Sequence, residues 1–143
     1  MMLFAAGFGT RMGALTRDRP KPLIEVGGKA LIDHALDLAD EIALPRVAVN
    51  THYHGDQIRR HLADRPQVKI SDESAEILET GGGLKAALPL LGDGPVAILN
   101  SDGIWTGQNP LRELAAAWDG SRMEALLLLL PLADTLAHGP KGD

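Results

Sequence analysis

The chain has 143 residues and is 45% hydrophobic, so it suits a single domain that can bury a core. Its 14 Lys and Arg against 19 Asp and Glu give a net charge of −5, which argues against a broad nucleic-acid-binding surface. It has no cysteine, which excludes disulfides, thiolate metal sites and a cysteine nucleophile and is compatible with a reducing cytoplasm.

The N-terminus reaches a glycine-rich turn within a few residues and lacks the basic and apolar regions of a signal peptide. We therefore expect a cytoplasmic protein. The most apolar run, Ala125 to Leu130, is far shorter than the ~20 residues that a membrane-spanning helix needs. For this run we predict a buried strand, and we expect no membrane partner.

Short apolar runs alternate with segments of helical periodicity, which is the pattern of β-α-β units. The apolar runs predict parallel strands at residues 2–6, 46–50, 68–71 and 96–100. The periodic segments predict helices at residues 31–42, 55–62, 83–91 and 111–118. Asn109 and Pro110 suit the start of the last helix as cap and first helical residue. We expect one compact α/β domain with a mainly parallel sheet.

Polar residues and glycines gather where three of the predicted strands end, at residues 7–11, 50–54 and 100–103. In parallel sheets of this kind, ligands bind beyond the carboxyl ends of the strands. These three segments are therefore the candidate binding site.

The turn after the first strand combines Gly7 and Gly9 with Thr10 and Arg11. Glycines let the backbone approach phosphate oxygens and take positive φ, so that successive N–H groups form an anion-binding concavity, to which Arg adds a charged fork. A tight turn with solvated arginines is the alternative interpretation. The cations that follow favour a polyphosphate site.

Two better-known glycine motifs are not supported by the spacing. Met12 stands where a dinucleotide-binding fingerprint requires glycine. Ala30 follows Gly28-Lys29, where a Walker motif requires a hydroxyl residue to hold the metal ion.

The opening of the chain extends this pattern through Ala5 to Met12, Leu15-Thr16 and Arg19 to Val26. It resembles the opening of the nucleoside-diphosphate-sugar pyrophosphorylases, which are sugar-1-phosphate nucleotidyltransferases. The family usually has a proline where Ala14 stands. The resemblance implies a Rossmann-like three-layer sandwich, the nucleotide-diphospho-sugar transferase fold.

The resemblance also implies roles for the residues of this opening. Arg11 and Lys21 would be catalytic, with Lys21 near the reacting α-phosphate and the sugar phosphate. A salt-bridged surface lysine is the alternative for Lys21. The residues that would embrace the nucleotide are Ala5, Ala6, Gly7, Gly9, Thr10 and Arg11.

Two further segments carry predicted nucleotide contacts. Similar enzymes hold the nucleobase and ribose with the loop that corresponds to residues 79–83, which implies contacts from Glu79, Gly81 and Gly82. A flexible turn is the alternative. Asn50 is predicted to touch the nucleoside. His52 and His54 nearby lack a third metal ligand, so we interpret them as structural.

Asp102 follows the fourth predicted strand, beside Gly103. A hard cation such as Mg²⁺ takes carboxylate oxygens and bridges phosphates, so Asp102 is the predicted metal ligand and Mg²⁺ the expected cofactor. An aspartate that only forms the turn is the alternative. In the family pattern, Asp102 corresponds to the first metal-binding aspartate.

The implied reaction joins a nucleoside triphosphate and a sugar 1-phosphate to give an NDP-sugar and pyrophosphate. The chain looks most like N-acetylmuramate 1-phosphate uridylyltransferases, and similar proteins are called mannose-1-phosphate guanylyltransferases, so uracil and guanine both stay open. Cytidylyl- and molybdenum-cofactor guanylyltransferases are a weaker alternative. The sequence specifies no oligomeric state.

The family pattern continues past Asp143 with strands that shape the sugar pocket and carry a second metal-binding aspartate. Asp134 and Asp143 lie in a Pro/Gly-rich tail and do not suit that role. We therefore expect a fold that is incomplete at the C-terminus, with residues 1–143 as the N-terminal nucleotide-binding portion of the domain. A nucleotide-binding regulatory module without efficient transfer is the alternative.

Overall fold

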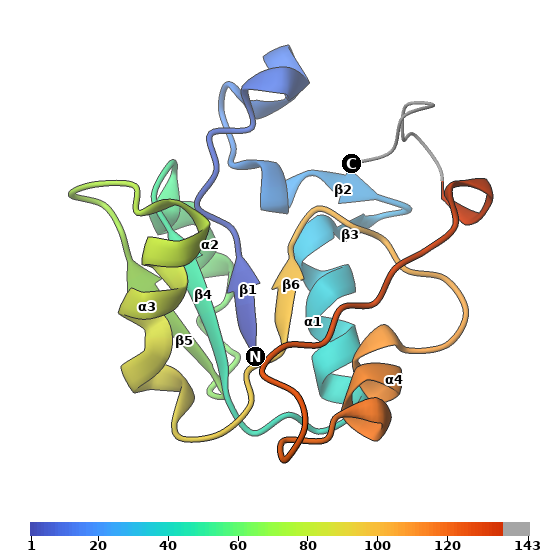
Figure 1. Ribbon diagram of the computed structural model, residues 1–143. Helices are drawn as coiled ribbons and strands as arrows, with labels where there is room; N and C mark the ends of the chain where they lie inside the picture. The colour runs from blue at the N-terminus through green and yellow to red at the C-terminus, as the bar shows by residue number, and fades with distance from the viewer. Residues whose placement is uncertain (136–143) are drawn as a thin grey trace.

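A four-stranded parallel sheet forms the centre of the computed structural model, which describes residues 1–135 (Figure 1). The strand order is β5-β4-β1-β6. The strands are β1 (Met2–Phe4), β4 (Val47–Thr51), β5 (Val68–Asp72) and β6 (Ile98–Asn100). All four predicted strands are therefore present, and the predicted α/β fold is confirmed.

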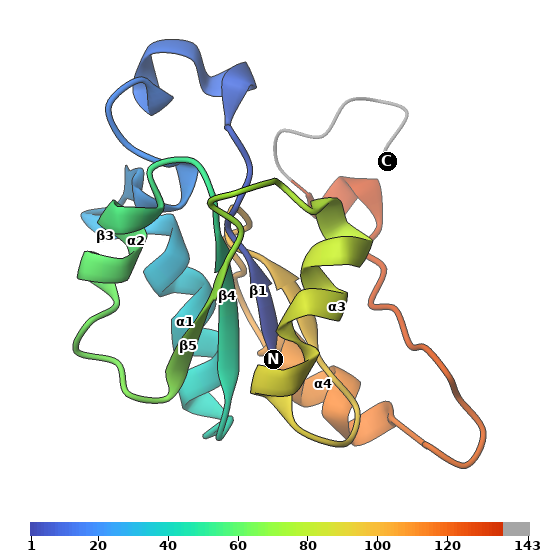
Figure 2. The ribbon, with the colours of Figure 1, turned by 90° about the vertical axis from the view of Figure 1, so that its left-hand side faces the viewer.

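Helices cover both faces of the sheet, as Figure 2 shows in a view along it. They are α1 (Leu31–Glu41), α2 (Gly55–His61), α3 (Glu79–Leu91) and α4 (Pro110–Ala117). The larger core cluster joins α1, α2 and α4 to one face, and the smaller cluster places Ala87 of α3 against Met2 and Ala48. This arrangement confirms the predicted three-layer sandwich.

The strand register brings three strand ends to one edge of the sheet. Phe4 of β1 pairs with Asn100 of β6, and Leu3 pairs with Val49 of β4. The residues that follow β1, β4 and β6 therefore project from the same edge, as the strand-end argument requires.

Several short elements were not predicted. A hairpin pairs β2 (Glu25–Val26) with β3 (Lys29–Ala30), and its turn consists of Gly27 and Gly28 at φ 62° and 79°. Two successive residues with positive φ suit a two-residue hairpin turn, so the Gly-Gly pair was an available signal. The chain also forms 3₁₀ turns, which are η1 (Thr10–Thr16), η2 (Lys21–Leu23) and η3 (Leu132–Asp134).

The predicted start of the third helix was wrong by four residues. The helix begins at Glu79, so the three glycines of residues 81–83 lie in its first turns and do not form a loop before it. The Leu78 N–H donates to the buried carboxylate of Glu73 over 3.0 Å. A carboxylate beside a helix N-terminus stabilises it and offsets the low helix propensity of glycine.

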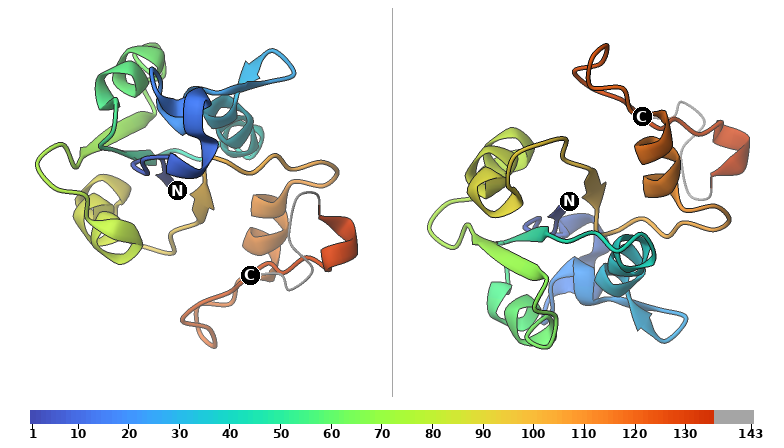
Figure 3. Two further views of the ribbon diagram at one scale, coloured as in Figure 1. Left: turned by 90° about the horizontal axis from the view of Figure 1, so that it is seen from above. Right: turned by 90° about the horizontal axis from the view of Figure 1, so that it is seen from below.

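The prediction of a buried strand at Ala125 to Leu130 was also wrong. The segment is irregular, and Leu127 and Leu129 are 78% and 80% exposed. An apolar run forms a strand only where a neighbouring strand pairs with it through backbone hydrogen bonds. Within residues 1–135, no strand pairs with the segment from Ala125 to Leu130. Figure 3 shows the segment beyond α4, away from the sheet.

Asp134 lies in η3, whereas Asp143 is outside the described residues. Among residues 1–135, no helix is long and apolar enough to cross a membrane.

Candidate active site

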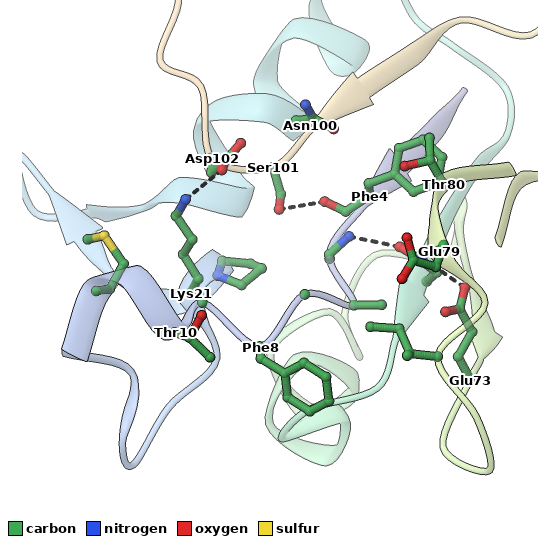
Figure 4. A pocket seen from close by; sticks show the side chains of 18 of the residues that line it. Phe4, Phe8, Thr10, Lys21, Glu73, Glu79, Thr80, Asn100, Ser101 and Asp102 are labelled. Atoms are coloured by element: carbon green, nitrogen blue, oxygen red, sulfur yellow. Dashed lines mark hydrogen bonds and ion pairs between the residues drawn. The ribbon is translucent and has the colours of Figure 1, made fainter. Parts of the chain in front are cut away.

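A cavity of about 550 Å³ opens where β1, β4 and β6 end (Figure 4). Most of the predicted site residues line it: Ala5, Ala6, Gly7, Gly9, Thr10, Arg11, Lys21, Asn50, Glu79 and Asp102. Gly81 and Gly82, which follow Glu79 and Thr80 in the first turns of α3, do not line it. The fold thus brings together segments that are far apart in the sequence.

One side of the cavity is the segment of residues 7–23, here called the glycine loop. Gly9 has φ 64°, and a Cβ at this position would lie 2.9 Å from Thr16 Cγ2 and 3.1 Å from Lys21 Cβ. Both the backbone conformation and the close approach therefore require glycine. Gly7 has open space around it instead.

The glycine loop is fastened at a few points. Thr16 is buried, and its hydroxyl lies 3.0 Å from the Gly9 carbonyl and 3.2 Å from the Gly13 carbonyl. Pro20 and Pro22 are buried as well. Arg11 stays exposed and lines the cavity, so its guanidinium can meet a ligand there.

On the opposite side Ala5, Asn50 and Glu73 line the cavity, and Gly83 packs behind Glu73 and Asn50. These four residues are here called the buried wall. The Ala5 N–H donates to Asn50 Oδ1 over 2.8 Å, and Asn50 Nδ2 donates to Glu73 Oε1 over 2.8 Å. A Cβ on Gly83 would lie 2.7 Å from Glu73 Oε1. The wall therefore links the end of β1 to β4, to the segment after β5 and to α3.

Glu73 is only 2% exposed, yet the groups that bond its carboxylate are neutral. A buried carboxylate needs hydrogen bonds to each oxygen or a nearby positive potential. Asn50 supplies one bond, the Leu78 N–H supplies the other, and the N-terminus of α3 supplies the potential. Sequence reasoning missed Glu73, because an acidic residue among polar neighbours also fits an exposed loop.

Lys21 and Asp102 meet on the far side of the cavity from Glu73 and Glu79 (Figure 4). Lys21 Nζ donates to Asp102 Oδ2 over 2.6 Å, and the two side chains are 30% and 41% exposed. Lys21, which was predicted to be catalytic, and Asp102, the predicted metal ligand, thus form one ion pair. Ser101 next to them is fixed, because its hydroxyl donates to the Phe4 carbonyl over 2.7 Å.

The histidines after β4 bond to backbone carbonyls. His52 Nδ1 lies 2.6 Å from the Glu73 carbonyl, and His54 Nε2 lies 3.2 Å from the Arg17 carbonyl. Since a carbonyl only accepts, each ring nitrogen donates. Within the described part of the chain, no three His, Cys, Asp or Glu side chains gather as a metal site.

Several cavity residues were given no role from the sequence, although Phe8, Asn100 and Ser101 lie within the predicted site segments 7–11 and 100–103. Phe8 is 46% exposed, and its ring lies edge-on to His52 with centroids 5.2 Å apart. Its place in the glycine loop was the available signal. The other lining residues without a predicted role are Phe4, Met12, Pro22, Glu73, Ile77, Thr80, Asn100 and Ser101.

A parallel sheet with a glycine-rich loop at its carboxyl edge is typical of the class of nucleotide-binding α/β proteins. Residues 1–129 match the family model of the MobA-like NTP transferase domain, and the chain belongs to this family.

Named relatives point within that family to sugar nucleotidyltransferases. The chain is 47% identical to the N-acetylmuramate alpha-1-phosphate uridylyltransferase of Caulobacter vibrioides and 35% identical to that of Neisseria meningitidis. Each match covers 99% of this chain and 62% of the relative. A mannose-1-phosphate guanyltransferase of Neurospora crassa is 31% identical over 96% of this chain and 39% of its own length. These relatives confirm the resemblance seen in the sequence.

The fold is also similar to that of solved structures. The crystal structure of HddC from Yersinia pseudotuberculosis complexed with GMP-PN matches 82% of this chain and 53% of its own, with a TM-score of 0.68 and 24% identity. At this identity the likeness supports the shared fold alone.

Proposed function

We propose that this chain binds a nucleoside triphosphate and transfers its nucleoside monophosphate to a sugar 1-phosphate. The observation that carries the proposal is the cavity at the strand ends, where the glycine loop, Arg11, Lys21 and Asp102 meet. The named relatives support it, because they carry the names of nucleotidyltransferases of this kind and match nearly the whole of this chain.

In the proposed reaction an oxygen of the sugar phosphate attacks the α-phosphorus in line. A new P–O bond forms as the bond to the β-phosphate bridging oxygen breaks, and pyrophosphate leaves with that electron pair. The attacking phosphate is already an anion at neutral pH, so no general base is needed. Catalysis then consists of positioning and charge neutralisation, which suits a site built from cations and backbone N–H groups.

Three of the predicted residues have a proposed part in this chemistry. Arg11 neutralises the triphosphate, and Lys21 lies between the α-phosphate and the sugar phosphate. Asn50 is 3% exposed and has both ends of its amide bonded within the buried wall, so we propose that it acts by holding Ala5 in place. Contacts from Glu79, Gly81 and Gly82 to the nucleoside stay predictions.

The donor set fits a Mg²⁺ ion that arrives with its nucleotide. Mg²⁺ is commonly held by one or two carboxylates together with substrate phosphates. Asp102 offers one such carboxylate at the cavity, and Lys21, its present partner, would be released toward the phosphates when the ion takes that carboxylate. When bound, the ion would neutralise charge that develops on the phosphate oxygens.

We propose UTP and N-acetylmuramate 1-phosphate as the substrates, because the relatives at 47% and 35% identity carry that name. GTP with mannose 1-phosphate is the second candidate, favoured by the relative at 31%. That residues 1–143 are the N-terminal nucleotide-binding portion of the domain, and that the protein is cytoplasmic, stay predictions.

Pyrophosphate release by the complete gene product tests these assignments. Five nucleoside triphosphates are each paired with the 1-phosphates of N-acetylmuramate, N-acetylglucosamine, mannose and glucose. We expect the strongest release from UTP with N-acetylmuramate 1-phosphate. Release from GTP with mannose 1-phosphate would replace the substrates but keep the reaction. Nucleotide binding without release in any pair would contradict catalysis and favour a binding module.

A further inference from the structure

Side chains from the start of α2 reach across to the second half of the glycine loop. Tyr53 Oη lies 3.1 Å and 3.2 Å from the carbonyl oxygens of residues 16 and 17. His54 Nε2 lies 3.2 Å from the carbonyl of residue 17, and Gln57 Nε2 donates to that of residue 18 over 2.9 Å. One short segment thus supplies donors to three consecutive loop carbonyls.

The backbone of His54 has an unusual conformation that helps its ring to reach the glycine loop. Its φ is 51°, in the left-handed region that residues with a side chain seldom adopt. Such a conformation persists only where the surrounding structure holds it. Here it places the His54 ring against Tyr53, with centroids 4.1 Å apart and the ring planes tilted by 58°, and carries Nε2 to the Arg17 carbonyl.

The loop has little else to fix it at this point. It projects beyond the sheet edge (Figures 1 and 2), Leu15 is 58% exposed, and Gly13 has open space around it. Its backbone forms only 3₁₀ turns, which leave many carbonyls without a partner in a sheet or an α-helix. Side-chain donors are therefore needed to hold it.

A chain of contacts continues from these donors toward the cavity. Tyr53 bonds the Thr16 carbonyl, and the Thr16 hydroxyl bonds the Gly9 carbonyl over 3.0 Å. Arg11 follows Gly9 by two residues and lines the cavity. A movement of residue 16 would therefore shift the backbone that carries Arg11.

We propose that Tyr53, His54 and Gln57 form a clamp of positioning residues that holds the glycine loop, and with it Arg11, in place over the cavity. The clamp touches no substrate. Its benefit for catalysis rests on the proposed function, because it assumes that Arg11 meets nucleotide phosphates. The hold on the loop itself does not depend on that assumption.

Limited digestion with trypsin measures the hold directly, in the absence of nucleotide. Arg19 and Lys21 precede prolines, which protect their bonds, so cleavage in this part of the loop follows Arg11 or Arg17. Tyr53→Phe removes the hydroxyl and keeps the ring that packs on Phe8. We expect cleavage after Arg17 to be about tenfold faster, the change in an opening equilibrium that loss of one or two hydrogen bonds gives.

Arg59→Gln is the matched control. Arg59 lies on the same helix but pairs with Asp72, away from the loop, so this variant should be cleaved after Arg17 at the wild-type rate. Gln57→Ala removes a second donor and should speed cleavage by a smaller factor. Unchanged cleavage in Tyr53→Phe and in Gln57→Ala would overturn the clamp. Equal acceleration in Arg59→Gln would also overturn it, because a general loosening of α2 would then explain the effect.

Nucleotide binding separates the clamp from the proposed function. With UTP or GTP and Mg²⁺ as probes, Tyr53→Phe should weaken apparent affinity by at most the factor by which cleavage rises, because affinity falls only with the fraction of molecules that hold a competent loop. The KM for nucleotide should rise accordingly, with kcat less affected. Faster cleavage with unchanged affinity and unchanged kcat/KM would overturn the positioning role. Wild-type protein that binds neither nucleotide would contradict the proposed function, while the digestion would still report on the clamp.

Discussion

The buried wall and the glycine loop face each other across one cavity but are held in different ways. The wall is made of hydrogen bonds between groups such as Asn50 and Glu73, which are 3% and 2% exposed. The loop is held mostly by surface contacts, and it exposes Phe8 and Leu15 by 46% and 58%. Substitutions in the wall should therefore mainly lower the free energy of unfolding, whereas substitutions in the loop should mainly lower turnover.

Gly83→Ala is the strongest challenge to the wall. The new Cβ would lie 2.7 Å from Glu73 Oε1 and 3.1 Å from Asn50 Nδ2, so it would push apart two buried, bonded groups. Overpacking together with a weakened buried hydrogen bond should lower the free energy of unfolding by about 3 kcal/mol. Urea denaturation followed by circular dichroism measures the loss.

Gly81→Ala is the control for this change, since it lies in the same helix with open space around its Cα. It should stabilise the protein by up to about 1 kcal/mol, the difference in helix propensity between glycine and alanine. Equal destabilisation by the two variants would show that the helix, and not the wall, sets the effect.

Arg11→Ala tests the loop side of the comparison. Removing a preorganised charge from the transition state should lower turnover by about 100-fold or more. The side chain is exposed, so the free energy of unfolding should change by less than about 0.5 kcal/mol. Steady-state kinetics and urea denaturation measure the two quantities.

Arg60→Ala is the control for this change. Arg60 is an exposed arginine outside the cavity, so this variant should keep normal turnover. Near-normal turnover in Arg11→Ala would remove Arg11 from the site.

Gly9→Ala should affect both quantities, because Gly9 lies where the loop is fastened. Its φ of 64° and the 2.9 Å approach to Thr16 Cγ2 leave no room for a side chain. We expect about 1 to 2 kcal/mol of lost stability, typical of a non-glycine residue forced into the left-handed region. Turnover should fall as Arg11 is displaced. Gly7→Ala, with nothing within 4 Å of the added Cβ, should leave stability unchanged within error. A stable, fully active Gly9→Ala would contradict the proposed fastening.

The smallest expected effect on stability concerns the ion pair between Arg59 of α2 and Asp72 of β5. This pair joins the helix that carries the clamp to the strand beside the wall. The Arg59 guanidinium bonds the Asp72 carboxylate over 2.9 Å and lowers the pKa of Asp72 below its ordinary value of 3.8. A lowered folded-state pKa gives stability that is present above pH 3.8 and lost as the pH falls through the folded value. Because Asp72 is half exposed, the gain should be below about 0.5 kcal/mol.

Asp72→Asn should therefore unfold slightly more easily than the wild type at pH 7, and the difference should shrink as the pH falls well below 3.8. Urea midpoints across this range measure it. A difference that is constant with pH would contradict an origin in the Asp72 charge.

The sequence predicted the parts of the fold that depend on local patterns. All four strands of the sheet followed from short apolar runs, and the helices followed from periodic apolar residues. For α1, the helical spacing of the sequence predicts an apolar face of Leu31, Ala35, Leu38 and Ile42. This face is only partly right, since Leu38 and Ile42 are partly exposed, whereas Leu36 and Ala39 are buried. Rotation of a helix about its axis depends on its neighbours, which one segment cannot reveal.

The parts that were missed depend on contacts distant in sequence. Glu73 is buried because Asn50, 23 residues earlier, and the start of α3 both bond it. Tyr53 was missed because its hydroxyl bonds the carbonyls of Thr16 and Arg17, which lie 37 and 36 residues earlier in the chain. The run from Ala125 has the composition of a strand, but whether it becomes one depends on a neighbour that its own residues do not specify.

Hydrogen exchange with and without nucleotide tests the central claim, that the glycine loop and the strand-end cavity bind a nucleoside triphosphate. Mass spectrometry follows the backbone amides with UTP or GTP and Mg²⁺ at saturating concentration. Amides of residues 7–12 should exchange more slowly with nucleotide, whereas those of β4, already bonded in the sheet, should not change. Nucleotide binding that leaves residues 7–12 unprotected would contradict the claim.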